Sequence, residues 1–292
     1  MRLIATDCRG STSRCVIASA TLKIFFALAG LLLGVGLLAF LLLYFGQNRL
    51  IYPIPDVDLP TDALSGSVTK IDLESSYGLL MPAVLKNGDR GPLIIFTHGN
   101  REAAFQWLDE FEALQDNGIS ILLVEYPGYA GAPGMPSLQS VKQAVVSAYD
   151  VARELPYVDA SRIVAYGRSV GGGAAALLAE SRPVAALCLE STFSSLEKLV
   201  SENGAPTHFL KDRYDNKSIV ENLSMPVFIY HGTEDTIIPL SHAHALSSAA
   251  ADATLLTEKC GHSDCPRPWQ ALQDFLDSKA PAVSASAPAQ QP

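Results

Sequence analysis

The chain has 292 residues, of which 48% are hydrophobic and 17% charged, with a formal net charge of −9 and a pI near 5.1. These proportions exclude a disordered polar chain and leave enough apolar surface for one sizeable catalytic domain. An acidic chain has no basic footprint for nucleic-acid phosphates, so we expect no nucleic-acid partner.

Residues 24–45 form an uncharged stretch, IFFALAGLLLGVGLLAFLLLYF, which as a helix has the length needed to span about 30 Å of hydrocarbon. A cleavable signal peptide has a shorter apolar region and a small-residue cleavage site, so an uncleaved transmembrane helix is favoured. The positive-inside rule then predicts a single-pass cell-membrane protein with residues 1–23 in the cytoplasm and the catalytic domain outside it. The bias rests on four basic residues before the helix, opposed there by Asp7 alone: Arg2, Arg9, Arg14 and Lys23.

After a linker at residues 46–65, short apolar runs alternate with longer helical patterns over residues 66–278. This alternation predicts an α/β domain with a mostly parallel eight-stranded sheet and helices on both faces. We expect a short cap insertion at residues 191–224 and a disordered Ala/Pro/Ser-rich tail at residues 279–292. The expected strands are residues 67–73, 79–85, 93–97, 119–124, 163–166, 184–189, 227–230 and 254–257. The expected helices are residues 103–117, 138–155, 172–180, 241–249 and 269–276.

The motif Gly167-Arg168-Ser169-Val170-Gly171 follows an expected strand and precedes an alanine-rich helix. A G-x-S-x-G motif in this setting is typical of a nucleophile elbow, in which the serine oxygen is held above the sheet. Ser169 is therefore the predicted nucleophile. The backbone N–H of Val170, at the start of the helix, is a predicted oxyanion donor.

A second oxyanion donor is expected from the loop after the strand at residues 93–97, and we predict the N–H of Asn100 or Arg101. His98 in the same loop is interpreted as a loop-shaping residue. It precedes Ser169 in the chain, whereas in a site of this kind the order is nucleophile, acid, histidine.

Asp235 follows the expected strand at residues 227–230, where an acid can orient an imidazole. Two alternatives to this acid are Glu234 and Glu190, and Glu190 is also suited to anchoring loops near the site. For the base, only His262 follows both the last expected strand and Asp235. The predicted triad is Ser169, Asp235 and His262.

Five cysteines occur without metal-binding spacing, and we predict no metal site. Cys188 lies in an apolar run and is interpreted as a small core residue. Cys260 and Cys265 flank His262, and a short disulfide between them would brace that loop if the domain faces an oxidising compartment. The sequence leaves this pairing open.

Over residues 47–278 the chain resembles the membrane-anchored α/β-hydrolase-domain proteins, which include bud-emergence homologues and protein depalmitoylases. The matching segments are QNRLIYPIP, FTHGN, EYPGYAGAPGMPS, YGRSVGG, LESTF, DRYDNKSIVENLSMPVFIYHGTEDTIIP and CGHSD. The resemblance implies the same triad and hydrolysis of acyl esters or thioesters without a cofactor. Pro127 and Ala132 depart from the family's glycine-rich pattern, and the family's cysteine-rich lipidated N-terminus is replaced by a spanning helix, so depalmitoylation is not carried over.

The expected function is that of a membrane-anchored serine hydrolase that forms an acyl-enzyme on a small-molecule or lipid acyl ester or thioester. Tyr126 and Phe193 are expected to contact the substrate, and the short cap predicts an open, shallow acyl site. Two alternatives are a peptidase or amidase on the same fold and a non-catalytic membrane-tethered binding protein.

Overall fold

The computed structural model describes residues 12–60, 64, 68–83 and 90–280. Most of the predicted tail, residues 281–292, and the first part of the predicted cytoplasmic segment, residues 1–11, lie outside these described residues. The chain divides between Gln47 and Asn48 into two compact units.

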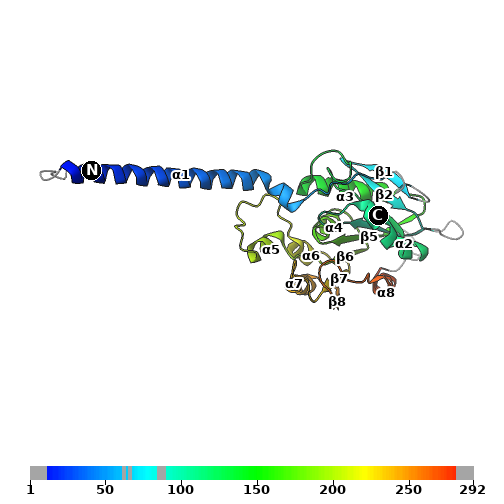
Figure 1. The fold of residues 1–292 in the computed structure, drawn as a ribbon. Coiled ribbons are helices and arrows are strands. Elements are labelled where there is room, and N and C mark those ends of the chain that lie inside the picture. The colour runs from blue at the N-terminus through cyan, green and yellow to red at the C-terminus, as the bar shows by residue number, and fades with distance from the viewer. Residues whose placement is uncertain (1–11, 61–63, 65–67, 84–89, 281–292) are drawn as a thin grey trace, which may run out of the picture. The chain divides into compact units, whose positions relative to one another are not determined.

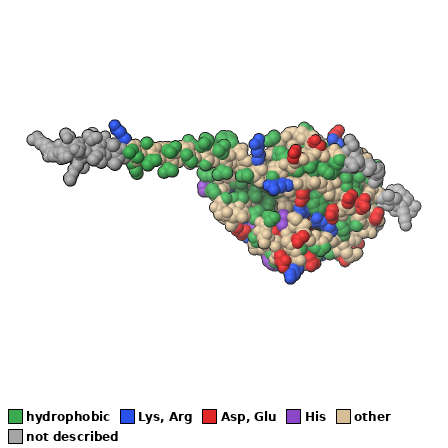
Figure 2. All heavy atoms as spheres, in the orientation of Figure 1, with side chains coloured by type: hydrophobic (Ala, Val, Ile, Leu, Met, Phe, Trp, Pro, Cys, Tyr) green, Lys and Arg blue, Asp and Glu red, His purple; other side chains and the backbone are tan. Residues whose placement is uncertain are grey.

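The first unit consists largely of helix α1 (Thr12–Ile51). Within this helix, Leu22–Ile51 is long and apolar enough to cross a membrane. Its most apolar window has a mean hydropathy of 2.7, and none of the residues in that window are buried. Hydrophobic side chains line the described part of the helix (Figure 2). The helix ends six residues later than the predicted span, which stopped at residue 45.

The end of α1 belongs to the second unit, where Ile51 and the following Tyr52 are buried in the hydrophobic core. The Tyr52 hydroxyl donates to Asp212 Oδ2 at 2.9 Å and lies 2.9 Å from the Tyr214 hydroxyl. Residues expected to be a linker therefore contribute to the packing of the domain.

The second unit contains one sheet of eight strands in the order β1-β2-β4-β3-β5-β6-β7-β8. The outer strands β1 and β8 lie on opposite sides of this domain (Figure 1). β2 pairs antiparallel with both β1 and β4, and the other five pairings are parallel. All eight predicted strands are present, which confirms the predicted sheet. Their bounds are β1 (Thr69–Leu73), β2 (Ser76–Met81), β3 (Gly91–Thr97), β4 (Ser120–Val124), β5 (Val158–Arg168), β6 (Ala186–Glu190), β7 (Val227–Gly232) and β8 (Ala253–Glu258).

Helices cover both faces of this sheet because alternate strand residues point to opposite sides. Leu93 and Ile95 of β3 pack in one core, whereas Ile94 and Phe96 pack in the other. The first core contains α3 (Leu138–Ala152), α4 (Val170–Ser181), α6 (Asn216–Glu221) and α7 (Ser241–Ala249). The second contains η3 (Ala104–Trp107), α2 (Leu108–Asp116) and α8 (Trp269–Lys279).

Some bounds differ from the predicted ones for local reasons. β5 begins five residues earlier than expected, because Val158 pairs with Gly91 across a register shift that the apolar pattern does not reveal. The predicted cap holds two short helices that periodicity did not indicate, α5 (Leu196–Glu202) and α6. Helices of six or seven residues are too short for a clear 3.6-residue pattern.

Candidate active site

Ser169 lies at the turn between β5 and α4, with φ of 55° and ψ of −123°. This left-handed backbone conformation is rare for a residue with a Cβ, and such strain concentrates at functional sites. The turn is possible because its neighbours are glycines: a Cβ on Gly171 would collide with the Thr97 carbonyl, and one on Gly167 would collide with Gly171. The local sequence thus holds a serine between a strand end and a helix N-terminus.

The three predicted triad residues lie within hydrogen-bonding distance of one another. His262 Nε2 is 3.1 Å from Ser169 Oγ, and His262 Nδ1 is 2.7 Å from Asp235 Oδ2. The other carboxylate oxygen of Asp235 accepts the backbone N–H groups of Ile237 and Ile238 at 2.9 and 2.8 Å. Both carboxylate oxygens are therefore engaged, which fixes the orientation of the acid.

Asp235 is held ionised in this environment. Burial alone would raise the pKa of its carboxyl, but hydrogen bonds from His262 and from the two isoleucine amides outweigh burial and lower the pKa below its usual range. A carboxylate only accepts hydrogen bonds, so His262 Nδ1 donates to it. In neutral His262, Nε2 is then free to accept the Ser169 proton.

His231, near the end of β7, lies beside Asp235. Its Nε2–H donates to the Ile238 carbonyl at 2.8 Å and lies 3.5 Å from Asp235 Oδ2. Burial lowers the pKa of His231, so the ring is neutral near pH 7. The ring holds the turn whose amides bind Asp235.

The two alternatives to Asp235 have other partners in the structure. Glu234 is exposed and lies 3.8 Å from Lys259. Glu190 is buried, accepts the Tyr166 hydroxyl at 2.5 Å and pairs with Arg267 at 2.5 Å. Of these three carboxylates, Asp235 is the one that contacts His262.

Val170 is the first residue of α4, so its N–H has no partner within the helix. Asn100 and Arg101 form an exposed turn after β3, and Arg101 has a φ of 60°. These are the residues predicted to donate to an oxyanion, and they lie at the carboxyl ends of β5 and β3, which are neighbours in the sheet.

His98, in the loop after β3, is fully buried and supports this loop from the interior of the domain. Its Nδ1 faces the Gly99 carbonyl at 2.9 Å, and its Nε2 faces Glu125 Oε1 at 2.8 Å. Burial alone would lower the pKa of His98, but the charge and hydrogen bond of Glu125 outweigh it and raise the pKa. Both ring nitrogens of His98 face oxygen acceptors, an arrangement that favours the doubly protonated ring. Glu125 was not singled out from the sequence, although a carboxylate directly after an apolar strand was the available signal.

Tyr126 and Phe193, the expected substrate contacts, are only 1% and 2% exposed. The Tyr126 hydroxyl donates to the His98 carbonyl at 2.7 Å, and Phe193 packs against Tyr214 with ring centroids 6.2 Å apart. The Tyr126 side chain thereby supports the loop after β3, and the Phe193 side chain belongs to the hydrophobic core. Their direct contact with substrate stays a prediction.

Cys260 and Cys265 form a disulfide that encloses the turn carrying His262, a pairing that the sequence left open. Cys188 is a buried free thiol, and burial raises its pKa. Among the described residues, no group of three or more His, Cys, Asp or Glu side chains is arranged to hold a metal ion.

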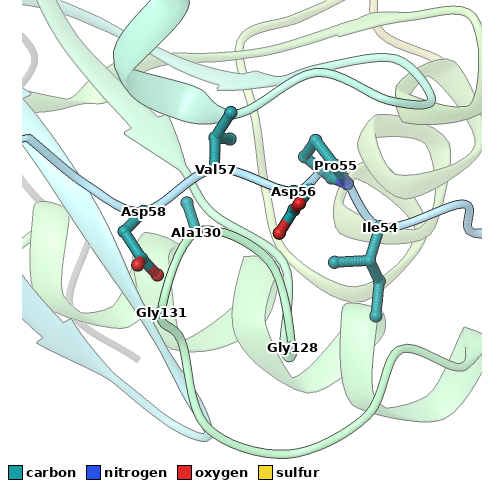
Figure 3. A pocket seen from close by; sticks show the side chains of 8 residues that line it. All are labelled: Ile54, Pro55, Asp56, Val57, Asp58, Gly128, Ala130 and Gly131. Atoms are coloured by element: carbon teal, nitrogen blue, oxygen red, sulfur yellow. The ribbon is translucent and has the colours of Figure 1, made fainter.

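A pocket of about 260 Å³ lies between residues 54–58 and the loop after β4. The side chains of Asp56 and Asp58 lie along it beside the backbone of residues 128–131 (Figure 3). None of the described residues that line it belongs to the triad, so we do not equate this pocket with the acyl site.

No family model matches the chain. It is 32% identical over 188 residues to an uncharacterised protein of Mycobacterium tuberculosis, covering 61% of this chain and 65% of that protein. This chain thus spans slightly less than two thirds of that relative's length. It is also 24% identical over 248 residues to the α/β-hydrolase domain-containing protein aho-3 of Caenorhabditis elegans, covering 83% of this chain and 74% of that protein.

Solved structures share the fold at low sequence identity. An acylaminoacyl peptidase of Pyrococcus horikoshii superposes with a TM-score of 0.61 at 16% identity, covering 76% of this chain and 43% of that one. Est1E of Butyrivibrio proteoclasticus, with ferulic acid bound, superposes with a TM-score of 0.60 at 19% identity, covering 72% of this chain and 98% of that one.

Proposed function

We propose that the chain is an α/β hydrolase, specifically a membrane-anchored serine hydrolase that cleaves acyl esters or thioesters; its likeness to the α/β-hydrolase domain-containing protein aho-3 and the fold it shares with solved structures support this. One observation carries the proposal: the hydrogen-bonded line from Asp235 through His262 to Ser169, with the serine on a strained strand-to-helix turn. A nucleophile, its base and the group that orients the base are the parts that acyl transfer needs.

The proposed reaction has two steps. His262 Nε2 takes the proton of Ser169 as the serine oxygen attacks the acyl carbonyl, and Asp235 stabilises the imidazolium that forms. The N–H groups of Val170 and of Asn100 or Arg101 bind the developing oxyanion. The leaving group departs with the proton from His262, and water, activated by the same ring, then releases the acid from Ser169.

A fluorophosphonate probe, which reacts with activated serines, tests the proposal on the full chain in detergent. We expect labelling of the wild type and none of Ser169→Ala, with full labelling of Ser161→Ala, a control at an exposed serine of β5. Absence of labelling in folded wild type would favour the non-catalytic binding protein.

A substrate panel separates the bond types. Esterase and acylaminoacyl peptidase structures are both similar to this chain in fold, so the panel contains an acyl ester, a thioester and a peptide amide of the same acyl group. We expect turnover of the ester or thioester above that of the amide. The cap holds only two short helices, α5 and α6, and we therefore expect short acyl esters to be preferred over long-chain triglycerides. The opposite order in either comparison would contradict the proposal.

We further propose that α1 anchors the protein in the cell membrane with its N-terminus in the cytoplasm and the catalytic domain outside. The charge bias around the helix supports this orientation. The disulfide beside His262 supports it independently, since disulfides persist in oxidising compartments. A C-terminal reporter enzyme that is active only outside the cytoplasm should be active, and a silent but expressed fusion would reverse the orientation.

A further inference from the structure

Arg168, the last residue of β5, directly precedes the nucleophile, and its side chain is only 4% exposed. A buried guanidinium is costly unless its charge and its N–H groups are satisfied. Its placement therefore depends on the groups around it, and these come from three separate parts of the chain.

The first group belongs to the loop that carries the expected second oxyanion donor. Arg168 Nη1 forms an ion pair and hydrogen bond with Glu102 Oε1. The other oxygen of Glu102 accepts the Gly99 N–H at 2.7 Å and the Trp107 indole N–H at 3.1 Å. Glu102 thus closes the turn that contains residues 100 and 101 and ties it to Arg168.

The second group belongs to the loop that carries the base. Arg168 Nη2 donates to the backbone carbonyl of His262 at 2.8 Å and to Ser263 Oγ at 3.1 Å. One planar guanidinium therefore contacts both loops that flank Ser169.

The third group is Glu190 at the end of β6, which lies 3.4 Å from Arg168 Nε and is 1% exposed. Glu190 also pairs with Arg267 at 2.5 Å. The cluster thus contains two arginines facing Glu102 and Glu190, and Arg267 also pairs with Glu110 at 3.2 Å.

We propose that Arg168 is a positioning residue that ties the oxyanion loop to the His262 loop and sets both relative to Ser169. The inference rests on the proposed function. Arginine suits this task because its donors point in several fixed directions from one plane, whereas a lysine ammonium is a single compact charge on a flexible stem. A displacement of about 1 Å in a site of this kind costs on the order of 100-fold in rate.

The test compares Arg168→Lys with Arg182→Lys, both in the full chain. Arg182 follows α4, and its side chain pairs with the exposed Asp150, so it offers the same substitution away from the site. The readouts are kcat and KM on a short acyl ester, with active sites counted by fluorophosphonate titration. We expect R168K to lower kcat per titrated site by about 10- to 100-fold with KM changed less than about threefold, and R182K to change neither.

A purely structural role would lower the yield of active sites and the melting temperature but leave kcat per site unchanged. A kcat for R168K within fivefold of the wild type would overturn the inference. If R168K fails to fold, Glu102→Gln tests the same tie from its other end, with the same expected loss and the same threshold. A wild type that is not labelled at all overturns the proposed function, whereas a labelled wild type beside an unimpaired variant overturns only the role of Arg168.

Discussion

Replacing Asp235 by asparagine should abolish most of the activity through the tautomer of His262. Asp235 Oδ1 accepts two backbone N–H groups, from Ile237 and Ile238, so the amide oxygen of an asparagine must take that position. Its NH₂ group then faces His262 Nδ1, where Oδ2 now accepts at 2.7 Å. A donor there forces Nδ1 to accept, so the proton moves to Nε2, which faces Ser169 and must be empty to act as a base.

The loss of a correctly oriented base in such a triad costs about 10⁴-fold in kcat. At 1.36 kcal/mol for each factor of ten, this is about 5 kcal/mol of transition-state stabilisation. The side-chain volume hardly changes, so the melting temperature of D235N should stay close to that of the wild type. Asp252→Asn is the matched control, because Asp252 is partly exposed and its carboxylate pairs with Lys279 at the end of α8 and not with a triad residue.

The assay is hydrolysis of a short acyl ester at saturating substrate, together with the second-order rate of fluorophosphonate labelling. Both should fall by a similar factor in D235N and stay unchanged in D252N. A D235N enzyme with kcat within tenfold of the wild type would refute the reasoning. If Glu190→Gln were then the inactive variant, the acid would be Glu190.

Three further predictions concern stability, measured as the midpoint of thermal unfolding in detergent. Because the pKa of His98 is raised, the stabilisation from its proton is complete below about pH 6.5 and is lost as pH rises through the raised folded pKa. Glu125→Gln should flatten this pH dependence and lower the free energy of unfolding by about 3 kcal/mol. Parallel curves of unfolding midpoint against pH for the wild type and the variant would contradict this prediction. Replacing both cysteines of the disulfide by serine should cost about 2 kcal/mol, the loop-closure value for so short a ring, and an unchanged midpoint would show that the bond does not constrain the unfolded chain. Gly173→Ala should cost about 1–3 kcal/mol, because its Cβ would stand 2.5 Å from a ring carbon of the buried Tyr214; a variant as stable as the wild type would mean that this ring can move aside.

The sheet was predictable because its strands are short apolar runs separated by helical patterns, and all eight are present. The elbow around Ser169 was predictable for a related reason: the glycines that permit the turn are adjacent in sequence. The order of Ser169, Asp235 and His262 along the chain identified three residues that the structure places within hydrogen-bonding distance. Their catalytic roles stay predictions until the variants are measured.

The cluster around Arg168 could not be predicted in the same way. Its partners Glu102, Glu190 and His262 are separated from it by 66, 22 and 94 positions, and only the parallel order of β3, β5 and β6 brings them to one edge. Nothing in the local pattern distinguishes a buried arginine at this point from an exposed one. The same holds for His98, whose partner Glu125 comes directly after the neighbouring strand β4.

The burial of Tyr52 determines where a truncated form that lacks most of α1 can begin. Its ring lies in the domain core, and its hydroxyl contacts Asp212 and the Tyr214 hydroxyl, while Tyr214 packs against Gly173, one turn after Ser169. A truncation at residue 66, where the strand pattern starts, would leave a cavity the size of a tyrosine and remove one of the hydrogen bonds to Asp212, which would keep the one from the Leu138 N–H at 2.8 Å. A truncated chain that retains residues from Asn48 onward would keep the Tyr52 side chain in the core while removing most of α1, the proposed membrane anchor.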